Sequence, residues 1–327
     1  MEKILMTGIS GSGRKELMMR VKENKDGLSL NAFDFGNMMY ELAKELNFTI
    51  KEEKILDLSP ISLRYLRSAV FEKIIADSHK KTTIVATHAS FRWRKHLTSA
   101  LDFHYLHLLN PDIYVNVIDS LPRVLRRLGE SPQWRSKLNS KEILIWRDEE
   151  FLLTKSLAEY QRKKFYTIPF SITPSSFLKL ITGMRRYKTY LSYPITYVNK
   201  AAKNMEEKDE FRKKLEDAGY IVFDPGWIDD ESGLSDDDKI ACNQDIYEQT
   251  VMRDYQLIDQ SDFITVYYYE PVMSPGVLSE LIYAFTNNKD VFVIFRGQQS
   301  PFMVYYSTNI FKDEDEFFEN LKATYPC

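Results

Sequence analysis

Two strongly apolar runs in the last third of the chain flank a segment with helical spacing. The first run, residues 261–269, contains β-branched and aromatic residues, and the second covers residues 290–295. Between them, residues 274–284 open with a serine, a proline and a glycine and continue with apolar residues at helical intervals. The pattern predicts strand, loop, helix and strand, the βαβ arrangement of α/β proteins. Glu280 then lies in the opening turns of the helix, near the loops where such proteins hold ligands.

Earlier segments continue the same alternation. Residues 190–196 end an apolar strand, a long polar helix follows, and residues 218–225 give the next strand. Residues 252–255 lie on the helix that precedes the run at 261–269. Near the N-terminus, an apolar strand at residues 3–7 leads directly into a glycine-rich turn and a helix. Both halves of the chain are therefore predicted to be α/β.

The length agrees with two domains. The chain has 327 residues, of which 44% are hydrophobic, and this exceeds the usual size of a single core. We expect a first domain over residues 1–151, a helical linker over 152–186 and a second domain over 187–327.

Charge and cysteine content exclude several classes of protein. The formal net charge of −3 indicates no broad basic surface, so we do not expect nucleic-acid binding. Cys242 and Cys327 are the only cysteines, which gives neither a disulfide framework nor a cysteine metal site, and we predict no metal site. The start lacks a leader pattern, and no apolar run approaches the roughly 20 residues that span a bilayer. We therefore expect a cytoplasmic protein without membrane contact.

Tyr190, Asp254 and Glu280, taken in order with their flanking strands, resemble the nucleoside 2-deoxyribosyltransferase family and its nucleotide N-glycosidase relatives. The resemblance covers about residues 187–300 and implies a Rossmann-like, flavodoxin-like domain. It also implies that Glu280 is the nucleophile that attacks the anomeric carbon of a sugar. Asp254 would protonate or hydrogen-bond the leaving base, and the Tyr190 hydroxyl would orient the nucleophile. Taken singly, each residue has a plainer interpretation. Glu280 can be an acid that favours the start of a helix, Asp254 a solvated helix-surface acid, and Tyr190 a strand aromatic in the core.

Ser274 distinguishes between branches of that family. Members that act on unphosphorylated nucleosides resemble each other in an Asp at this position, six residues before the nucleophile. An acid would repel a phosphate, whereas a serine at a helix N-terminus would accept one, although Ser274 can also be a simple N-cap. The chain is thus most similar to the nucleoside 5′-monophosphate hydrolase branch, except that its loop 193–196 lacks that branch's glycine and basic residue. The resemblance implies further substrate-binding residues: Ser192, Asp224, Gly276 and, from a partner subunit, Ser300.

The first glycine-rich turn has the spacing of a phosphate-binding loop. Gly8 and Gly13 are correctly separated, Gly11 lies between them, and a strand and a helix flank the turn. The usual continuation is Lys followed by Ser or Thr, whereas this chain has Arg14 and Lys15. Backbone N–H groups and these cations can still bind phosphate, but the hydroxyl that binds Mg²⁺ is missing. We expect phosphate binding without efficient phosphoryl transfer; a glycine turn with no ligand is the alternative.

Further segments follow this loop in an order that resembles small nucleoside monophosphate kinases, most of all the archaeal adenylate kinase type. These segments are residues 33–39, 64–67, 83–89, 111–118 and 122–128. The resemblance covers about residues 1–150 and implies a P-loop kinase fold with Arg127 and its neighbours over the phosphates. A basic solvated helix face is the plainer interpretation of Arg127. Ala86 replaces the family's acidic residue, which removes a second group related to Mg²⁺.

Two classes of function follow. The first is an enzyme: an N-glycosidase that cleaves a (deoxy)nucleoside 5′-monophosphate through Glu280 without a cofactor, or a nucleoside 2-deoxyribosyltransferase. The second is a catalytically inactive, nucleotide-binding regulatory protein. Retention of Glu280, Asp254 and Tyr190 favours the enzyme, while Arg14 and Lys15 favour the regulator for the first half. Nucleotides are the expected small-molecule partners, one of them in the N-terminal domain, and the family resemblance implies a homodimer.

Overall fold

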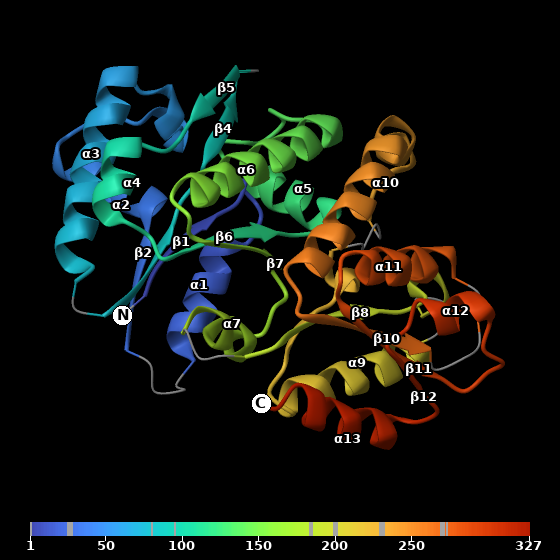
Figure 1. Cartoon of the computed structure of the whole chain (residues 1–327). Coiled ribbons are helices and arrows are strands. Elements are labelled where there is room, and N and C mark those ends of the chain that lie inside the picture. The colour runs from blue at the N-terminus through green and yellow to red at the C-terminus, as the bar shows by residue number, and fades with distance from the viewer. Residues whose placement is uncertain are drawn as a thin grey trace. The chain divides into compact units, whose positions relative to one another are not determined.

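The computed structural model shows a chain of alternating helices and strands (Figure 1). It describes residues 2–24, 29–79, 81–94, 96–182, 186–198, 202–228, 233–268, 272 and 274–327. The chain divides into two compact units. The first comprises Met1–Thr182 and Asp230–Ile246, and the second comprises Gly183–Asp229 and Tyr247–Cys327.

A parallel sheet of five strands forms the centre of the first unit, in the spatial order β2, β3, β1, β6, β7. The strands are β1 (Lys3–Thr7), β2 (Leu30–Asp34), β3 (Thr82–Ala86), β6 (Ile113–Ile118) and β7 (Lys164–Pro169). Every residue of β6 is buried, as are all but the first residue of β1 and β3. Such continuous burial is typical of parallel strands with helices on both faces. The glycine-rich loop leaves the central strand β1 at the carboxyl edge of the sheet, where α/β proteins hold ligands.

Helices and one hairpin complete this unit. They are α1 (Arg14–Glu23), α2 (Phe35–Glu45), η1 (Lys51–Glu53), η2 (Ile55–Asp57), α3 (Pro60–Asp77), α4 (Phe103–Leu109), α5 (Leu121–Glu130), α6 (Ser140–Tyr160) and α7 (Pro174–Ile181), with the antiparallel strands β4 (Ser90–Trp93) and β5 (His96–Ser99). Local sequence sets the helix starts. At α6, for example, Asn139 and Glu142 form a reciprocal capping box. The beginning of α10 (Asp236–Asp259) also belongs to this unit, because Leu234, Cys242 and Ile246 are buried in a hydrophobic cluster with Ile9.

The structure differs from the helical linker that we predicted over residues 152–186. α6 continues to Tyr160, and Lys164–Pro169 form β7, which pairs in parallel with β6. The first half of β7 is partly exposed and begins with a lysine, as is common in an edge strand, so its sequence lacks a continuous apolar run. The fifth strand of the sheet was therefore missed.

The second unit contains another parallel sheet of five strands, in the spatial order β12, β11, β10, β8, β9. The strands are β8 (Lys188–Ser192), β9 (Ile221–Phe223), β10 (Phe263–Tyr268), β11 (Asp290–Phe295) and β12 (Asn309–Phe311). Counted within the unit, this is the order 2-1-3-4-5 of doubly wound sheets. The strand order reverses between β8 and β10, and ligands of such sheets bind at the carboxyl ends of the strands at this switch point.

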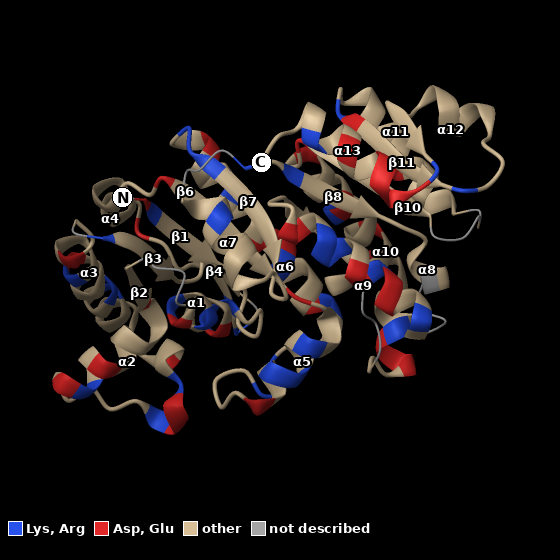
Figure 2. Cartoon of the chain, turned by 90° about the horizontal axis from the view of Figure 1, so that it is seen from below, with Lys and Arg blue, Asp and Glu red and all other residues tan. Residues whose placement is uncertain are grey.

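The helices of the second unit are α8 (Ile195–Val198), α9 (Ala202–Asp217), η3 (Pro225–Trp227), the remainder of α10, α11 (Pro275–Thr286), α12 (Pro301–Tyr305) and α13 (Glu314–Thr324). Leu191, Phe211, Phe292 and Phe317 lie in the core on one side of the sheet. Among the described helices, none combines the length and the apolar character needed to cross a bilayer. Charged residues gather on helices such as α5, α9 and α10 (Figure 2).

Candidate functional site

Glu280 is buried because of its position on α11. Ser274 caps this helix and Pro275 occupies its first turn, which fixes where the helical register begins. Val277, Glu280 and Ala284 then fall on the buried face at intervals of three and four residues. The carboxylate is therefore held against the unit's interior, where only 9% of the residue remains exposed.

Two hydroxyl groups from β8 hold this carboxylate. The Tyr190 hydroxyl donates to Oε1 of Glu280 at 3.0 Å, and the Ser192 hydroxyl donates to Oε2. Residues two apart on a strand point to the same face, whereas Leu191 between them points to the opposite face and packs in the core. The structure thus brings together three residues that the sequence predicted for the site.

Asp254 is the second carboxylate of the group. It lies on α10 with Leu257 and Ile258, and all three are buried at the helical intervals expected of one face. Asp254 is 7% exposed, and its Oδ1 accepts no hydrogen bond from any described residue. The charge of Asp254 helps to raise the pKa values of both Tyr190 and Glu280. This buried oxygen therefore requires a proton or a ligand donor to satisfy it.

The two carboxyl groups are poised to share a proton near neutral pH. Burial, and then the charge of Asp254, raise the pKa of Glu280 to about 8, against the opposing effect of the Ser192 and Tyr190 hydroxyls. Burial also raises the pKa of Asp254 to about 6, against the opposing charge of Arg253. Because the groups interact, these pKa values belong to the pair. Burial and the charge of Asp254 favour a proton on Glu280, while the two hydroxyls that donate to Glu280 favour its carboxylate form, so the one proton of the pair can lie on either acid.

Tyr268 and Arg253 are additional residues that the sequence did not indicate for this site. Tyr268 ends β10, and burial together with the charge of Glu280 raises its pKa to about 12. Arg253 is 7% exposed and lowers the pKa of its neighbour Asp254. Tyr268 could have been found from its position at the carboxyl end of the strand beside the switch point, where such sheets bind ligands. Nothing in the sequence separated Arg253 from other helix-surface arginines.

Asp224, also predicted to bind substrate, is committed to a different set of contacts. Its carboxylate is fully buried, and it accepts hydrogen bonds from the Tyr193 hydroxyl at 2.7 Å and from Lys208 Nζ at 2.8 Å. The N–H of Gly226 donates to it as well, at 3.0 Å. A carboxylate with this many internal donors stabilises the loop after β9. It is not exposed to a ligand in this structure.

The two serines predicted for a phosphate site are helix caps. Ser274 Oγ accepts the N–H of Val277 at 3.4 Å, and Ser300 Oγ accepts the N–H of Met303 at 3.2 Å. Each hydroxyl proton is still available for donation, because a hydroxyl both accepts and donates. Gly276 lies in the first turn of α11, directly after Pro275. A phosphate role for these residues stays a prediction.

The glycine-rich loop of the first unit has the backbone conformation that its glycines permit. Gly11 and Gly13 have φ of 80° and 82°, in the left-handed region that other residues rarely adopt. A Cβ at Gly13 would clash with the Phe170 ring. Gly8 donates its N–H to Glu150 Oε1 at 3.0 Å. The loop is therefore fixed both by conformation and by a buried acid.

Glu150 is a site residue that the sequence analysis missed. It is 1% exposed on α6, and besides Gly8 it accepts the N–H groups of Ala89 and Ser90, each at 2.7 Å, and the Ser90 hydroxyl at 2.9 Å. Burial raises its pKa, while these donors oppose the rise. Glu150 thereby joins the loop after β1 to the segment after β3.

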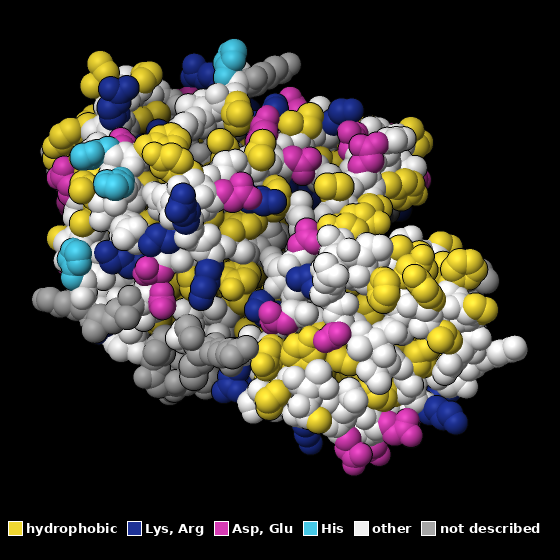
Figure 3. Space-filling view, viewed as in Figure 1, with side chains coloured by type: hydrophobic (Ala, Val, Ile, Leu, Met, Phe, Trp, Pro, Cys, Tyr) yellow, Lys and Arg dark blue, Asp and Glu magenta, His cyan; other side chains and the backbone are white. Residues whose placement is uncertain are grey.

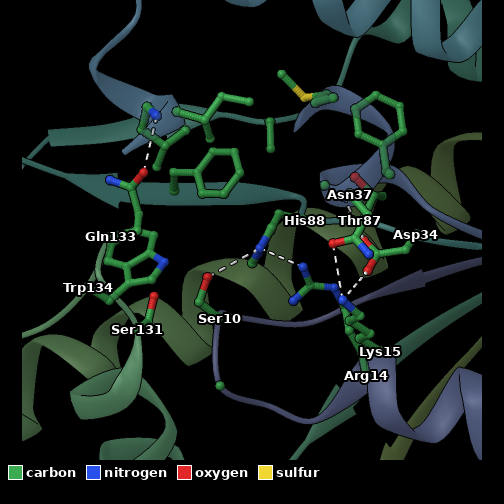
Figure 4. Close-up of a pocket in the computed structure, with 18 of the residues that line it drawn as sticks. Ser10, Arg14, Lys15, Asp34, Asn37, Thr87, His88, Ser131, Gln133 and Trp134 are labelled. Atoms are coloured by element: carbon green, nitrogen blue, oxygen red, sulfur yellow. Dashed lines mark hydrogen bonds and ion pairs between the residues drawn. The ribbon is translucent and has the colours of Figure 1, made fainter. Parts of the chain in front are cut away.

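The two cations after the loop contact different partners (Figure 4). Arg14 donates to the carbonyl oxygens of Gly8 and Ile9 at 2.8 and 3.1 Å, and it lies 2.6 Å from His88 Nε2. Burial and the charge of Arg14 hold the pKa of His88 well below its usual range, so the imidazole is neutral and accepts. Lys15 instead contacts Asp34 at 3.2 Å and Asn37 at 3.1 Å.

A pocket of about 500 Å³ opens beside this loop. Its lining includes Arg14, Lys15, Arg67 and Arg127 together with the aromatic side chains of Phe91 and Trp134. Arg127 donates to the carbonyl of Gly11 at 2.7 Å and to Asp119 at 2.6 Å. The predicted arginine thus reaches the loop, with most of its charge balanced by a buried acid. A cavity with cations and aromatic walls suits a phosphate-bearing ligand with a planar ring.

The first unit is similar in sequence to known proteins. Residues 7–144 match the family described as an AAA domain. The adenylate kinase of Methanococcus vannielii is 26% identical over 143 residues, which are 43% of this chain and 74% of that protein. The adenylate kinase of Methanoculleus marisnigri is 28% identical over 137 residues, or 41% and 71% of the two chains. These matches support a P-loop kinase-like fold for the first unit, as predicted.

Solved structures of kinases are also similar. A shikimate kinase from Acinetobacter baumannii in complex with shikimate has a TM-score of 0.34 and 15% identity, covering 51% of this chain and 83% of its own. A shikimate kinase from Bacteroides thetaiotaomicron has a TM-score of 0.33 and 11% identity, covering 66% of this chain and 98% of its own.

Proposed function

We propose that the second unit is an N-glycosidase that cleaves the base from the sugar of a (deoxy)nucleoside 5′-monophosphate. The observation that carries the proposal is the buried pair of carboxyl groups, Glu280 and Asp254, at the carboxyl end of the sheet. Two hydroxyl donors orient Glu280, and the pair keeps one proton across neutral pH. Glycosidic cleavage requires one carboxylate to attack and one carboxylic acid to protonate the leaving group.

The reaction takes two steps. A carboxylate oxygen of Glu280 attacks the anomeric carbon, the bond to the base breaks, and its electron pair leaves on the base nitrogen while Asp254 supplies the proton. Water then attacks the same carbon, gives its proton to Asp254 and releases Glu280 as the carboxylate. The products are the free base and the sugar 5-phosphate. A carboxylic acid and a carboxylate supply all of this chemistry, so no cofactor is needed.

The phosphate is the second specificity element. Ser274 begins α11, where the unpaired N–H groups of the first turn and the helix dipole favour an anion. Its hydroxyl can donate to a phosphate oxygen, whereas an aspartate at the same place would repel it. The loop with Tyr193 and Pro194 offers no cation, so the donors on α11 and Ser300 of a second copy carry this role.

The first unit binds a nucleotide in the pocket beside Gly8, Gly11 and Gly13 and does not transfer phosphoryl groups efficiently. This assignment depends on the lining of that pocket and on the family match over residues 7–144. Nucleotide binding by the first unit does not depend on glycosidase activity in the second unit.

One experiment tests the proposal against its alternatives. The protein is incubated with each ribo- and deoxyribonucleoside 5′-monophosphate, and free base is measured by mass spectrometry. Release of base in water supports the glycosidase. Release that occurs only when a second base is added, with formation of a new nucleoside or nucleotide, supports a 2-deoxyribosyltransferase instead. The absence of any base release contradicts both and leaves a nucleotide-binding regulatory protein.

A further inference from the structure

Lys15 stands at the position where a phosphate loop normally supplies a hydroxyl to a metal ion. Nucleotide kinases with such a loop bind Mg²⁺ through that hydroxyl and an acidic residue, and the ion bridges the phosphates. Mg²⁺ requires near-octahedral oxygen ligands and keeps several waters, so it is bound through carboxylates and phosphates. Whether this pocket suits the ion depends on its oxygen donors.

The donors of this pocket do not suit a divalent cation. Oδ2 of Asp34 forms an ion pair with the Lys15 ammonium at 3.2 Å. Asp34 also caps α2, because its Oδ1 accepts the N–H of Asn37 at 3.2 Å. Both carboxylate oxygens are therefore engaged. The side-chain oxygen of Asn37 is also engaged by Lys15, at 3.1 Å. Ala86 ends β3 and has no side-chain ligand atom, and the described residues contain no cluster of three His, Cys, Asp or Glu side chains that could hold a metal.

Two arginines of the same pocket, Arg14 and Arg67, form no ion pair with a carboxylate among the described residues. Arg14 hydrogen-bonds to neutral groups, the carbonyls of Gly8 and Ile9 and the His88 ring, and the charges of Glu150 and Asp34 act on it beyond ion-pair distance. Arg67 donates to the carbonyl of Ser99 at 3.2 Å, and among the described residues no carboxylate lies within ion-pair distance of it. A metal cation added beside Lys15 and Arg14 would increase the repulsion, whereas an anion would relieve it.

We propose that this loop binds the phosphate groups of a nucleotide without a divalent metal ion, with the Lys15 ammonium fulfilling the role of the ion. The inference rests on the proposed nucleotide binding by the first unit and adds how the phosphate charge is neutralised. Lys15 is half exposed at the mouth of the pocket, and Asp34 and Asn37 hold its ammonium in place (Figure 4). A fixed ammonium neutralises charge but cannot exchange ligands as a metal ion does. The loop can therefore bind the phosphates of a nucleotide without catalysing phosphoryl transfer.

The test is calorimetric titration of the full chain with ATP, once with excess Mg²⁺ and once with EDTA. The wild type should bind ATP with the same affinity in both buffers. Lys15→Met removes the ammonium and keeps the side-chain length, so it should weaken binding in both buffers by about tenfold or more, as the loss of a charged contact implies. Lys15→Ser restores the hydroxyl and should bind more tightly with Mg²⁺ than with EDTA. Lys22→Met, which removes an exposed lysine of the same helix outside the pocket, should bind like the wild type.

Each outcome is decisive. Wild-type affinity that is about tenfold or more higher with Mg²⁺ than with EDTA overturns the metal-free site while leaving the nucleotide site intact. The same conclusion follows if Lys15→Met and Lys22→Met bind alike. No binding of ATP in either buffer, with a chain that melts cooperatively, contradicts nucleotide binding by the first unit itself. Because Glu280 is unchanged in every variant, base release provides an independent measure of the second unit.

Discussion

The hydroxyl group of Tyr190 lies 3.0 Å from Oε1 of Glu280, although 90 positions separate the two residues in the sequence. The contact exists because β8 and β10 are neighbours in the sheet and α11 follows β10. It ties the first strand of the unit to the helix that carries the nucleophile. The proposed chemistry therefore depends on the strand order as well as on the residues.

Substitution of Glu280 by Gln should abolish base release while preserving the fold. The change removes the nucleophile and keeps the volume, and loss of a nucleophile costs at least about a thousandfold in rate. Tyr190→Phe removes one orienting donor and should reduce the rate by roughly tenfold to a hundredfold. Steady-state assays with matched circular dichroism spectra measure both effects. Turnover retained in folded Glu280→Gln would exclude the covalent mechanism.

The pKa of Glu280 predicts how stability depends on pH. Burial and the charge of Asp254 raise this pKa from 4.5 to about 8 in the folded chain. The folded state then holds the proton more tightly than the unfolded state, so the contribution is complete below the ordinary pKa and is lost as pH rises through the folded pKa. The free energy of unfolding should fall between pH of about 4.5 and 8, by on the order of a few kcal/mol.

Urea unfolding of the full chain across this pH range measures that slope. Glu280→Gln should flatten it, because the variant has no proton to lose at this position. Glu319→Gln is the matched control, since it neutralises an exposed carboxylate on α13 of the same unit and should leave the slope unchanged. Equal slopes in all three proteins would mean that Glu280 is not a buried, proton-holding group.

Ser274→Asp should reverse the preference between phosphorylated and unphosphorylated substrates. Asp is as good an N-cap as Ser, so α11 should begin at the same residue. Its charge would repel a 5′-phosphate, and the ratio of kcat/KM for nucleotide over nucleoside should fall by about tenfold or more. Ser279→Asp, which places the same charge on the exposed face of α11, is the control. A wild type with equal kcat/KM for both substrates would contradict the phosphate site.

The sequence was informative where a single segment carries its own signal. Residues 290–295 were predicted as a strand with the bounds of β11, because an unbroken apolar run is bounded by polar residues. Asp224 was assigned to the substrate site by the family resemblance, and the sequence could not separate the alternatives, because a strand-end acid has the same sequence context whether it faces a ligand or a buried lysine. Glu150 gave no signal at all. Its partners Gly8 and Ala89 lie 142 and 61 positions away, and only the folded sheet brings them together.

The first unit should not phosphorylate AMP at rates typical of a kinase. The loop lacks both the Lys-hydroxyl pair and the acid before Thr87, so the groups that would hold a metal ion against the phosphates are absent. A coupled assay with ATP, AMP and Mg²⁺ should show no turnover above background. Arg14→Lys with Lys15→Ser rebuilds the usual loop and provides the informative comparison. Magnesium-dependent turnover by the wild type at roughly 1–100 per second would refute this prediction.

The family resemblance predicts a homodimer in which Ser300 of one copy completes the phosphate site of the other. Exposed apolar side chains on α11 and α12 provide a surface for it, since Phe302 and Tyr305 are 64% and 69% exposed and hydrophobic groups gather on this face (Figure 3). Buried aromatic residues dominate such interfaces, so Phe302→Asp should weaken self-association by roughly 30-fold or more. Met205→Asp adds the same charge to an exposed apolar position on α9 and should leave the dimer intact. Light scattering at micromolar concentration, combined with the base-release assay, checks both. A monomer that releases base at the full rate would show that Glu280 works without a second copy and would remove Ser300 from the site.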